Sequence, residues 1–137
     1  MNSKQIIVIR KDLNMRVGKI AAQASHASIA FLTKSGHMIL GDTNSEDSFN
    51  NGSFSSEHAH VVKHWLENSF RKIVCYVKSE VELEELYEKA IEAGLIAHLV
   101  IDNGATEFHN VPTKTCIAIG PAWDYQLEGV TNHLQLL

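Results

Sequence analysis

The segment 18–27 has the sequence GKIAAQASHA and follows the apolar run Ile6–Ile9 after a short polar turn. Lys19, Gln23 and His26 recur within it at steps of four and three, so a helix places them on one stripe. A second, apolar stripe lies about a quarter turn away and suits packing on a sheet; it consists of Ile20, Ala24, Ala27 and Phe31. We therefore expect one helix that packs on a sheet and presents polar side chains beside it.

Strand-like and helix-like segments alternate along the rest of the chain. The expected strands are 5–10, 73–77, 97–101 and 115–119; the expected helices are 18–31, 57–68, a helix opened by Ser79 and closed by Gly94, and a C-terminal stretch from Pro121. Such alternation is typical of a layered α/β sheet with helices on both faces. Residues 41–57 (GDTNSEDSFNNGSFSSE) are nearly all small or polar, which predicts a loop excursion within one domain over residues 1–137.

Composition indicates a globular protein with a sizeable core. The chain has 137 residues, of which 45% are hydrophobic. It contains no run of about 18 apolar residues, and its first residues lead straight into an expected strand, so we expect no membrane span, no signal peptide and a cytoplasmic location. Cys75 and Cys116 lie in strand-like runs without close spacing, a pattern typical of buried free thiols.

Charge is distributed unevenly along the chain. The net charge is −4, but residues 1–34 hold six basic residues and a single acidic one, a local charge of +5. The remainder holds six basic and fifteen acidic residues, a charge of −9. The basic part surrounds segment 18–27, where it would suit a phosphate-bearing partner. An ordinary solvated surface is the alternative, and charge alone favours it.

The order of segments also predicts where a site would form. In an open α/β sheet, ligands bind beyond the carboxyl ends of the parallel strands. The first expected strand ends near Arg10 and leads to Lys19, and the third is followed at once by Asp102. If these strands are parallel, Lys19 and Asp102 lie at the same edge. The polar loop 102–114 supports a functional role, although Asp102-Asn103-Gly104 alone is also a turn signature.

Three histidines are the best candidates for metal ligands. His60 and His64 are spaced to chelate from one helix, and His58 is close by in the sequence. No carboxylate or cysteine completes an evident set near them, so a solvated helix face is the favoured interpretation and we expect no metal site.

Three blocks of the chain resemble the signature of the type II peptidyl-tRNA hydrolases. The blocks are Gly18-Lys19-x-Ala21-Ala22-Gln23-x-x-His26-Ala27, Asp102-x-Gly104-x-Thr106 and Thr115-x-x-x-Ile119-Gly120-Pro121. Each block alone is weak, but together, in this order, they cover nearly the whole chain apart from the excursion. Two positions depart from the family pattern, because Ala105 stands where the family often has a basic residue and Glu107 where it often has glutamine.

The resemblance implies both a fold and a reaction. The implied fold is a three-layer α/β/α domain with a four-stranded mixed sheet, the fourth strand antiparallel, and a homodimer in many members. The implied reaction cleaves the ester that joins a peptide or N-blocked amino acid to the 3′ end of tRNA, without a metal or other cofactor. An antiparallel fourth strand would start at the edge of Lys19 and Asp102 and bring Thr115 into the cleft.

Ester hydrolysis requires an activated water, a stabilised carbonyl oxygen and a leaving hydroxyl. The resemblance implies that Asp102 orients or deprotonates the water and that Lys19 stabilises the oxyanion. Gln23, Thr106 and Thr115 would hold the acyl group or the terminal adenosine, and His26 would move a proton or hold Asp102. Contacts to tRNA are expected from Arg10, Lys11, Arg16 and Lys34, and from the start of the helix at Gly18, whose N–H groups suit a phosphate.

Two other functions fit the sequence. One is a module of the same fold that binds RNA or a small ligand without turnover, although such a module would need neither Lys19 nor Asp102. The other is a protein-interaction scaffold that uses the acidic helix 80–92. That scaffold predicts an exposed apolar patch on the helix, whereas its leucines have the spacing of core residues.

Overall fold

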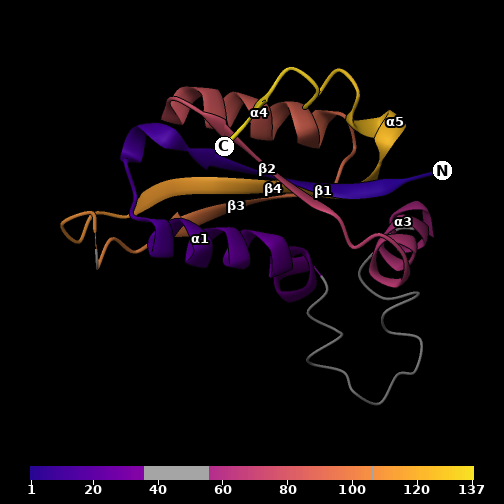
Figure 1. Cartoon of the computed structure of the whole chain (residues 1–137), viewed down its shortest axis with the longest axis horizontal. Coiled ribbons are helices and arrows are strands. Elements are labelled where there is room, and N and C mark those ends of the chain that lie inside the picture. Colours follow the sequence, from indigo (N-terminus) through magenta and orange to yellow (C-terminus); the bar gives the residue numbers. More distant parts are fainter. Residues whose placement is uncertain (36–55, 106) are drawn as a thin grey trace, which may run out of the picture.

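One mixed β-sheet forms the centre of the structure, a computed structural model that describes residues 1–35, 56–105 and 107–137 (Figure 1). Its strands are β1 (Ser3–Arg10), β2 (Lys72–Val77), β3 (Ala97–Asp102), β4 (Thr113–Trp123) and β5 (Gln135–Leu136). They lie in the order β3-β4-β1-β2-β5. β1 and β2 are parallel, whereas β4 is antiparallel to β1 and to β3. β1, β2 and β3 therefore run in one direction and end at the same edge of the sheet, where β4 begins.

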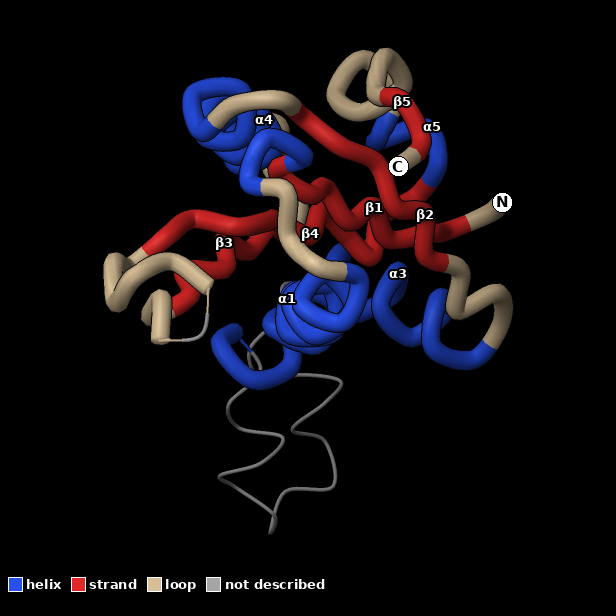
Figure 2. Tube along the Cα trace, turned by 60° about the vertical axis from the view of Figure 1, so that its left-hand side comes forward, coloured by secondary structure: helices blue, strands red, loops and turns tan. Residues whose placement is uncertain are grey.

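Helices cover both faces of this sheet (Figures 1 and 2). The helices are α1 (Val17–Ala30), α3 (Ser56–Glu67), α4 (Glu80–Glu92) and α5 (Asp124–Leu127), and two short turns, η1 (Lys11–Leu13) and η2 (Phe31–Ser35), flank α1. α1 and α3 lie on one face, and α4 and α5 lie on the other. The predicted α/β class, with helices on both faces and an antiparallel fourth strand, is confirmed.

The core is divided between the two faces by the alternation of side chains along β1. Ile6 and Val8 pack with the leucines of α4, and Ile7 and Ile9 pack under α1. All four are almost completely buried. This pattern makes β1 an interior strand with an apolar layer on each side.

Helix α1 packs on the sheet through the predicted stripe, with one exception. Ile20, Ala24 and Ala27 contact the core around Ile7 and Ile9. Phe31 instead packs against Trp65 of α3, with the ring centroids 5.9 Å apart. The reason is that α1 ends at Ala30, so Phe31 already belongs to η2 and leaves the helical stripe.

The prediction of four strands is wrong, because the described residues contain a fifth, β5, which pairs antiparallel with β2. The C-terminal stretch from Pro121, predicted to be helical, first continues β4 as far as Trp123 and contains only the four-residue helix α5. Proline is tolerated there because the β1–β4 register shifts between Lys4 and Ile6, opposite this point, so its missing N–H interrupts no regular ladder.

The remaining local predictions have mixed outcomes. The cap of α4 is confirmed, since Ser79 Oγ accepts a hydrogen bond from the backbone N–H of Glu82 at 3.1 Å. Cys75 and Cys116 are buried free thiols, as predicted.

The polar excursion predicted at residues 41–57 lies outside the described residues except for its last two, which begin α3. Among the described residues, no helix is long and apolar enough to cross a membrane.

The leucines of α4 belong to the core, as their spacing predicted. Leu83 and Leu86 are 0% and 6% exposed and pack against β1 and β4 side chains. The exposed apolar residues of this helix, Val81 and Ile91, lie ten positions apart in the sequence. The scaffold function therefore lacks the apolar patch that it predicts on this helix.

Candidate active site

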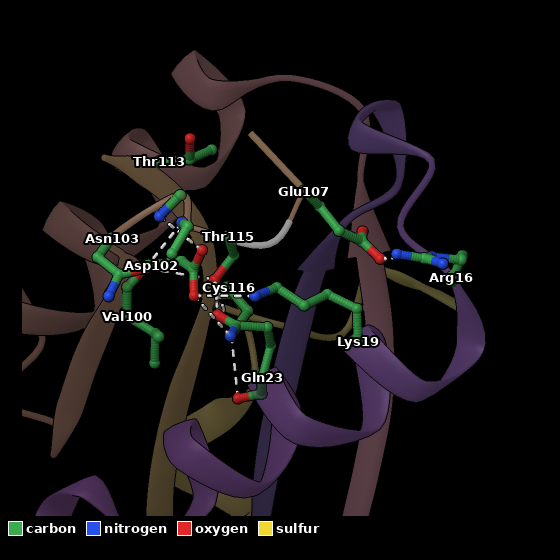
Figure 3. Close-up of polar contacts among 12 residues, drawn as sticks. Arg16, Lys19, Gln23, Val100, Asp102, Asn103, Glu107, Thr113, Thr115 and Cys116 are labelled. Carbon is green, nitrogen blue, oxygen red and sulfur yellow. Dashed lines mark hydrogen bonds and ion pairs between the residues drawn. The ribbon is translucent and has the colours of Figure 1, made fainter. Parts of the chain in front are cut away.

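The carboxylate of Asp102, the last residue of β3, lies at the carboxyl edge of the sheet and faces α1 (Figure 3). Its Oδ1 accepts hydrogen bonds from Lys19 Nζ (3.0 Å) and Gln23 Nε2 (3.3 Å), and its Oδ2 accepts one from the backbone N–H of Gly104 (2.9 Å). The side chains of Lys19 and Asp102 are only 14% and 13% exposed. The prediction that these two ionisable residues share one edge of the sheet is confirmed.

Opposing effects determine the pKa of Asp102. Burial raises this pKa, but the hydrogen bonds from Lys19, Gly104 and Gln23, together with the charge of Lys19, lower it below its ordinary value of 3.8. Asp102 is therefore ionised at neutral pH. A carboxylate in this state is a weak base, and it is well suited to hold donors in a fixed position.

Gln23 connects this carboxylate to the interior. The residue is 2% exposed, and its Oε1 accepts a hydrogen bond from Thr115 Oγ1 (2.5 Å) while its Nε2 donates to Asp102. Both ends of the buried amide are thus satisfied, as burial of a polar group requires. The contacts join β4, α1 and β3 through three side chains, so Asp102 is held from the core side.

A β-bulge in β4 brings Thr115 to this face of the sheet. Val100 pairs with Cys116 and Ile101 with Lys114, so Thr115 is an extra residue in the ladder. Cys116 packs under α1, and regular alternation would send its neighbour to the opposite face. Thr115 is fully buried, so its hydroxyl supports Gln23 and does not line the surface of the cleft.

Cys116 lies next to this network and is not a candidate nucleophile. Its Sγ donates to the backbone carbonyl of Gln23 at 3.4 Å. Burial raises the pKa of the thiol to about 11, with the Thr115 hydroxyl acting in the opposite direction. The group therefore stays protonated at neutral pH.

A cavity of about 480 Å³ opens beside Asp102. α1 and η2 form one wall and β3 with its following residue forms the other; the lining residues are Gln23, His26, Ile29, Ala30, Thr33, Leu99, Val100, Ile101, Asp102 and Asn103. Its volume is typical of ligand sites, and its lining combines apolar side chains with the polar side chains of Gln23, His26, Thr33, Asp102 and Asn103. This cavity is the candidate substrate site.

His26 borders the cavity without contacting Asp102. The side chain is exposed, and within the described ranges it makes no hydrogen bond. The contact through which His26 would hold Asp102 is therefore not seen, and proton transfer is the role that stays a prediction. Thr106, the other polar residue predicted for the site, lies outside the described residues.

The loop after β3 is closed by a turn and tied to α1. Gly104 has a positive φ of 82°, and a Cβ there would lie 2.2 Å from the backbone oxygen of Val111, so only glycine fits. Further along the loop, Glu107 Oε1 accepts a hydrogen bond from Arg16 Nε at 2.8 Å. The predicted turn at Asp102 therefore exists, and its carboxylate also takes part in the cluster with Lys19.

The residues predicted to bind tRNA differ in how accessible they are. Arg10 is 11% exposed and bonded to Asp12 and to the backbone oxygen of Lys114. Arg16 is 81% exposed although it pairs with Glu107.

The other predicted tRNA contacts lie near the same end of α1 or follow it. Lys11 is exposed, with its ammonium 4.5 Å from the centre of the Tyr76 ring. Lys34 lies in η2, and its side chain is outside the described part; Gly18, in the first turn of α1, has open space beside it.

Two of the three histidines considered as metal ligands, His58 and His64, contact different partners. His58 Nε2 lies 2.9 Å from the backbone oxygen of Gly94, and His64 Nδ1 lies 2.7 Å from Ser3 Oγ. Over residues 1–35, 56–105 and 107–137, no three side chains of the kinds that bind metals gather in one place.

Comparison with known proteins identifies the family. The family model for peptidyl-tRNA hydrolase PTH2 matches residues 3–137. The chain belongs to this family. The peptidyl-tRNA hydrolase of Methanothermobacter thermautotrophicus is 36% identical over 134 residues, which is 98% of this chain and 99% of that protein. That of Sulfurisphaera tokodaii is 38% identical over the full length of both chains. A probable peptidyl-tRNA hydrolase 2 of Dictyostelium discoideum is 35% identical, with 97% of this chain aligned to 54% of that protein.

Membership of a family of peptidyl-tRNA hydrolases gives the Asp102 cluster its chemical context. Sequence reasoning found Lys19, Gln23 and Asp102, but it missed the ion pair of Arg16 with Glu107 and the supporting position of Thr115. The ion pair had no sequence signal, because its partners are 91 positions apart. The extra residue in β4 likewise leaves no mark in a run of apolar and polar residues.

Proposed function

We propose that this chain cleaves the ester of peptidyl-tRNA at Asp102, where the carboxylate borders the cavity. The observation that carries the proposal is the cluster of Lys19, Gln23 and Asp102, which places a carboxylate that lines a cavity of substrate size 3.0 Å from an ammonium group. Support from Thr115 holds this cluster in a fixed geometry, which favours electrostatic catalysis.

The reaction follows from these charges. A water molecule held by Asp102 attacks the ester carbonyl carbon, and the carbonyl oxygen gains negative charge that Lys19 stabilises. The bond to the ribose oxygen then breaks, and the proton lost by the water ends on that oxygen. The products are a peptide acid and a tRNA with a free 3′ end. Because both oxygens of Asp102 already accept hydrogen bonds and its pKa is lowered, we assign it mainly to orienting the water.

The remaining site residues take supporting roles. Gln23 positions Asp102, and Thr106 binds the acyl group or the terminal adenosine. His26, on the wall of the cavity, is the second candidate for the base that takes the proton from the water.

The tRNA phosphates are bound by Lys11, Arg16, Lys34 and the N–H groups near Gly18. Arg10 contributes mainly by holding the end of β1. The enzyme acts in the cytoplasm, and assembly as a homodimer is a further prediction that light scattering checks.

Release of labelled N-acetyl-aminoacyl groups from tRNA by the purified protein tests the proposed function. We expect turnover, and we expect it to be unchanged after the enzyme has been treated exhaustively with EDTA, because water and oxyanion are handled by Asp102 and Lys19. Tight binding of tRNA without release would identify a binding module. Loss of activity in EDTA with rescue by zinc would contradict the assigned mechanism.

Replacement of Arg16 by alanine tests the basic surface. We expect Arg16→Ala to weaken binding of all tRNAs alike and to reduce the slope of log affinity against log salt by about one, because one phosphate contact is lost. The matched variant is Glu107→Gln, which releases Arg16 from its ion pair and removes a negative charge, so it should bind tRNA more tightly. An unchanged slope in Arg16→Ala would place the tRNA elsewhere on the surface.

A further inference from the structure

β3 is one of the two outer strands of the sheet, as Figure 2 shows. Its backbone ladder runs along β4, and no other strand in the described ranges pairs with it. Such an edge presents backbone N–H and C=O groups on its outer side that can bind another extended chain. β3 also leads directly to Asp102, so its outer edge begins at the proposed site of reaction.

The cavity beside Asp102 runs along this edge. Its β3 wall consists of four consecutive residues, from Leu99 to Asp102. Successive side chains of a strand point to opposite faces, so one cavity can touch four in a row only along the strand edge. Ile101 and, on the α1 wall, Ile29 are 57% and 51% exposed. The result is a groove with an apolar rim and a strand edge as one side.

The backbone groups that face this groove can be assigned from the register. The carbonyl of Ile96 accepts a hydrogen bond from the N–H of Gly120, so it faces β4. The bulge between β3 and β4 lies in β4, at Thr115, and leaves the alternation along β3 intact. The N–H and C=O groups of Ala97, Leu99 and Ile101 therefore point away from β4, toward the outer edge.

We propose that the peptide part of the substrate lies along the outer edge of β3 as an added parallel strand. The inference rests on the proposed function, which places the ester carbonyl at Asp102. The peptide is bonded to that carbonyl through its C-terminal residue, so it extends back along the groove toward Ala97. Its C-terminus then lies at the C-terminal end of β3, which makes the two chains parallel.

Strand addition suits the chemistry of this substrate class. Backbone hydrogen bonds are the same for every peptide sequence, and they give affinity without selecting side chains. The apolar rim at Ile29 and Ile101 adds contact area for side chains of any shape. β3 has six residues, which corresponds to about 20 Å of extended chain. The benefit of added peptide residues should therefore stop after about five.

The decisive experiment changes the substrate and leaves the enzyme intact. The parent enzyme is given tRNA esterified with alanine peptides of about five residues, each N-methylated at one peptide nitrogen. In a parallel added strand, alternate residues direct both backbone groups at β3. We therefore expect N-methylation to lower kcat/KM about fivefold at every second position and to have little effect at the positions between.

A variant of the enzyme provides the second arm. Ile101→Pro removes one outward N–H and places a ring at the edge, whereas Ile101→Val keeps the N–H. The quantity compared is kcat/KM for the pentapeptide substrate divided by kcat/KM for the N-acetyl-aminoacyl substrate, which strand addition makes greater than one in the parent enzyme. We expect this ratio to fall toward about one in Ile101→Pro and to keep its parental value in Ile101→Val.

Each outcome supports or overturns the inference. An N-methylation effect that is uniform or absent, or a length preference that survives in Ile101→Pro, overturns strand addition. If the groove holds the terminal adenosine of tRNA, peptide length and N-methylation have no effect, which also overturns it. Those results leave the proposed function standing, because all substrates are still hydrolysed. Failure to hydrolyse any of them would refute the proposed function and this inference with it.

Discussion

Asp102→Asn should hydrolyse N-acetyl-aminoacyl-tRNA at least about a hundredfold more slowly than the parent, the contribution typical of a general base or of a group that orients the attacking water. Asparagine keeps the size of the side chain and removes the negative charge that holds the water and Lys19. Binding of tRNA should survive, since the phosphate contacts are elsewhere. Single-turnover rates and equilibrium binding measure the two effects separately.

The matched control is Asp12→Asn, which makes the same change in a carboxylate that pairs with Arg10 at the same end of the sheet. It should keep the turnover of the parent. If Asp102→Asn hydrolyses at close to the parental rate, Asp102 serves only its turn with Gly104, and the catalytic assignment moves to His26, Glu107 or His109.

The pH dependence separates Asp102 from a histidine base. Since the pKa of Asp102 lies below 3.8, activity that depends on this carboxylate should stay level as the pH falls from 7 to 5. A histidine base would lose activity across that range, because histidine titrates there. A rate profile of the parent enzyme between pH 4 and 8 distinguishes the two candidates.

The same lowered pKa has a consequence for stability. The ionised Asp102 stabilises the folded state at pH values above 3.8, and this contribution is lost as the pH falls through the lowered pKa. Asp102→Asn should therefore melt below the parent at pH 7, and the difference should shrink in strong acid. Thermal unfolding at the two pH values checks this and shows whether loss of activity reflects loss of fold.

Lys19→Ala should lower kcat by on the order of 3 kcal/mol, or roughly a hundredfold or more, if the ammonium group is the main stabiliser of the oxyanion. KM should change less than kcat, because the interaction is strongest in the transition state. Loss of Lys19 also removes a group that lowers the pKa of Asp102, so the acid limb of the rate profile should move to higher pH.

Lys63→Ala, at an exposed position of α3, is the control for loss of a lysine and should leave turnover unchanged. The double variant of Lys19 and Asp102 should cost less than the sum of the single changes, because the two residues act in one step. Fully additive losses, or a Lys19→Ala variant with raised KM and parental kcat, would show that Lys19 binds the substrate without stabilising the transition state.

Local sequence patterns were sufficient to predict strands β1 to β4 and helices α1, α3 and α4. The four-and-three spacing of Lys19, Gln23 and His26 specifies a helical stripe, and the apolar run at Ile6–Ile9 specifies a strand with two buried faces. These predictions succeeded because each depends on the geometry of one element. The shared edge for Lys19 and Asp102 also followed, since it required only that β1 and β3 be parallel.

The sequence could not determine the contacts between elements, because such contacts leave no periodic pattern within either segment. The two-residue strand β5 exists because β2 offers an unpaired edge to the C-terminus, and two residues carry no pattern of their own. The bulge at Thr115 depends on how β4 matches β3, and it alone brings the hydroxyl to Gln23. The pairing of Arg16 with Glu107 depends on how the loop after β3 folds back toward α1.

The sequence by itself therefore determined the α/β class, the helix that carries Lys19 and Gln23, and the edge at which Asp102 would meet them, because periodicity and chain order are local properties. Only the tertiary structure decided that Gln23 is buried between Asp102 and Thr115, that Arg10 is bonded to Asp12 and to the backbone of Lys114, and that the outer edge of β3 borders the cavity. These features arise from the register and packing of segments distant in the chain, where the buried amide of Gln23 finds partners at both of its ends.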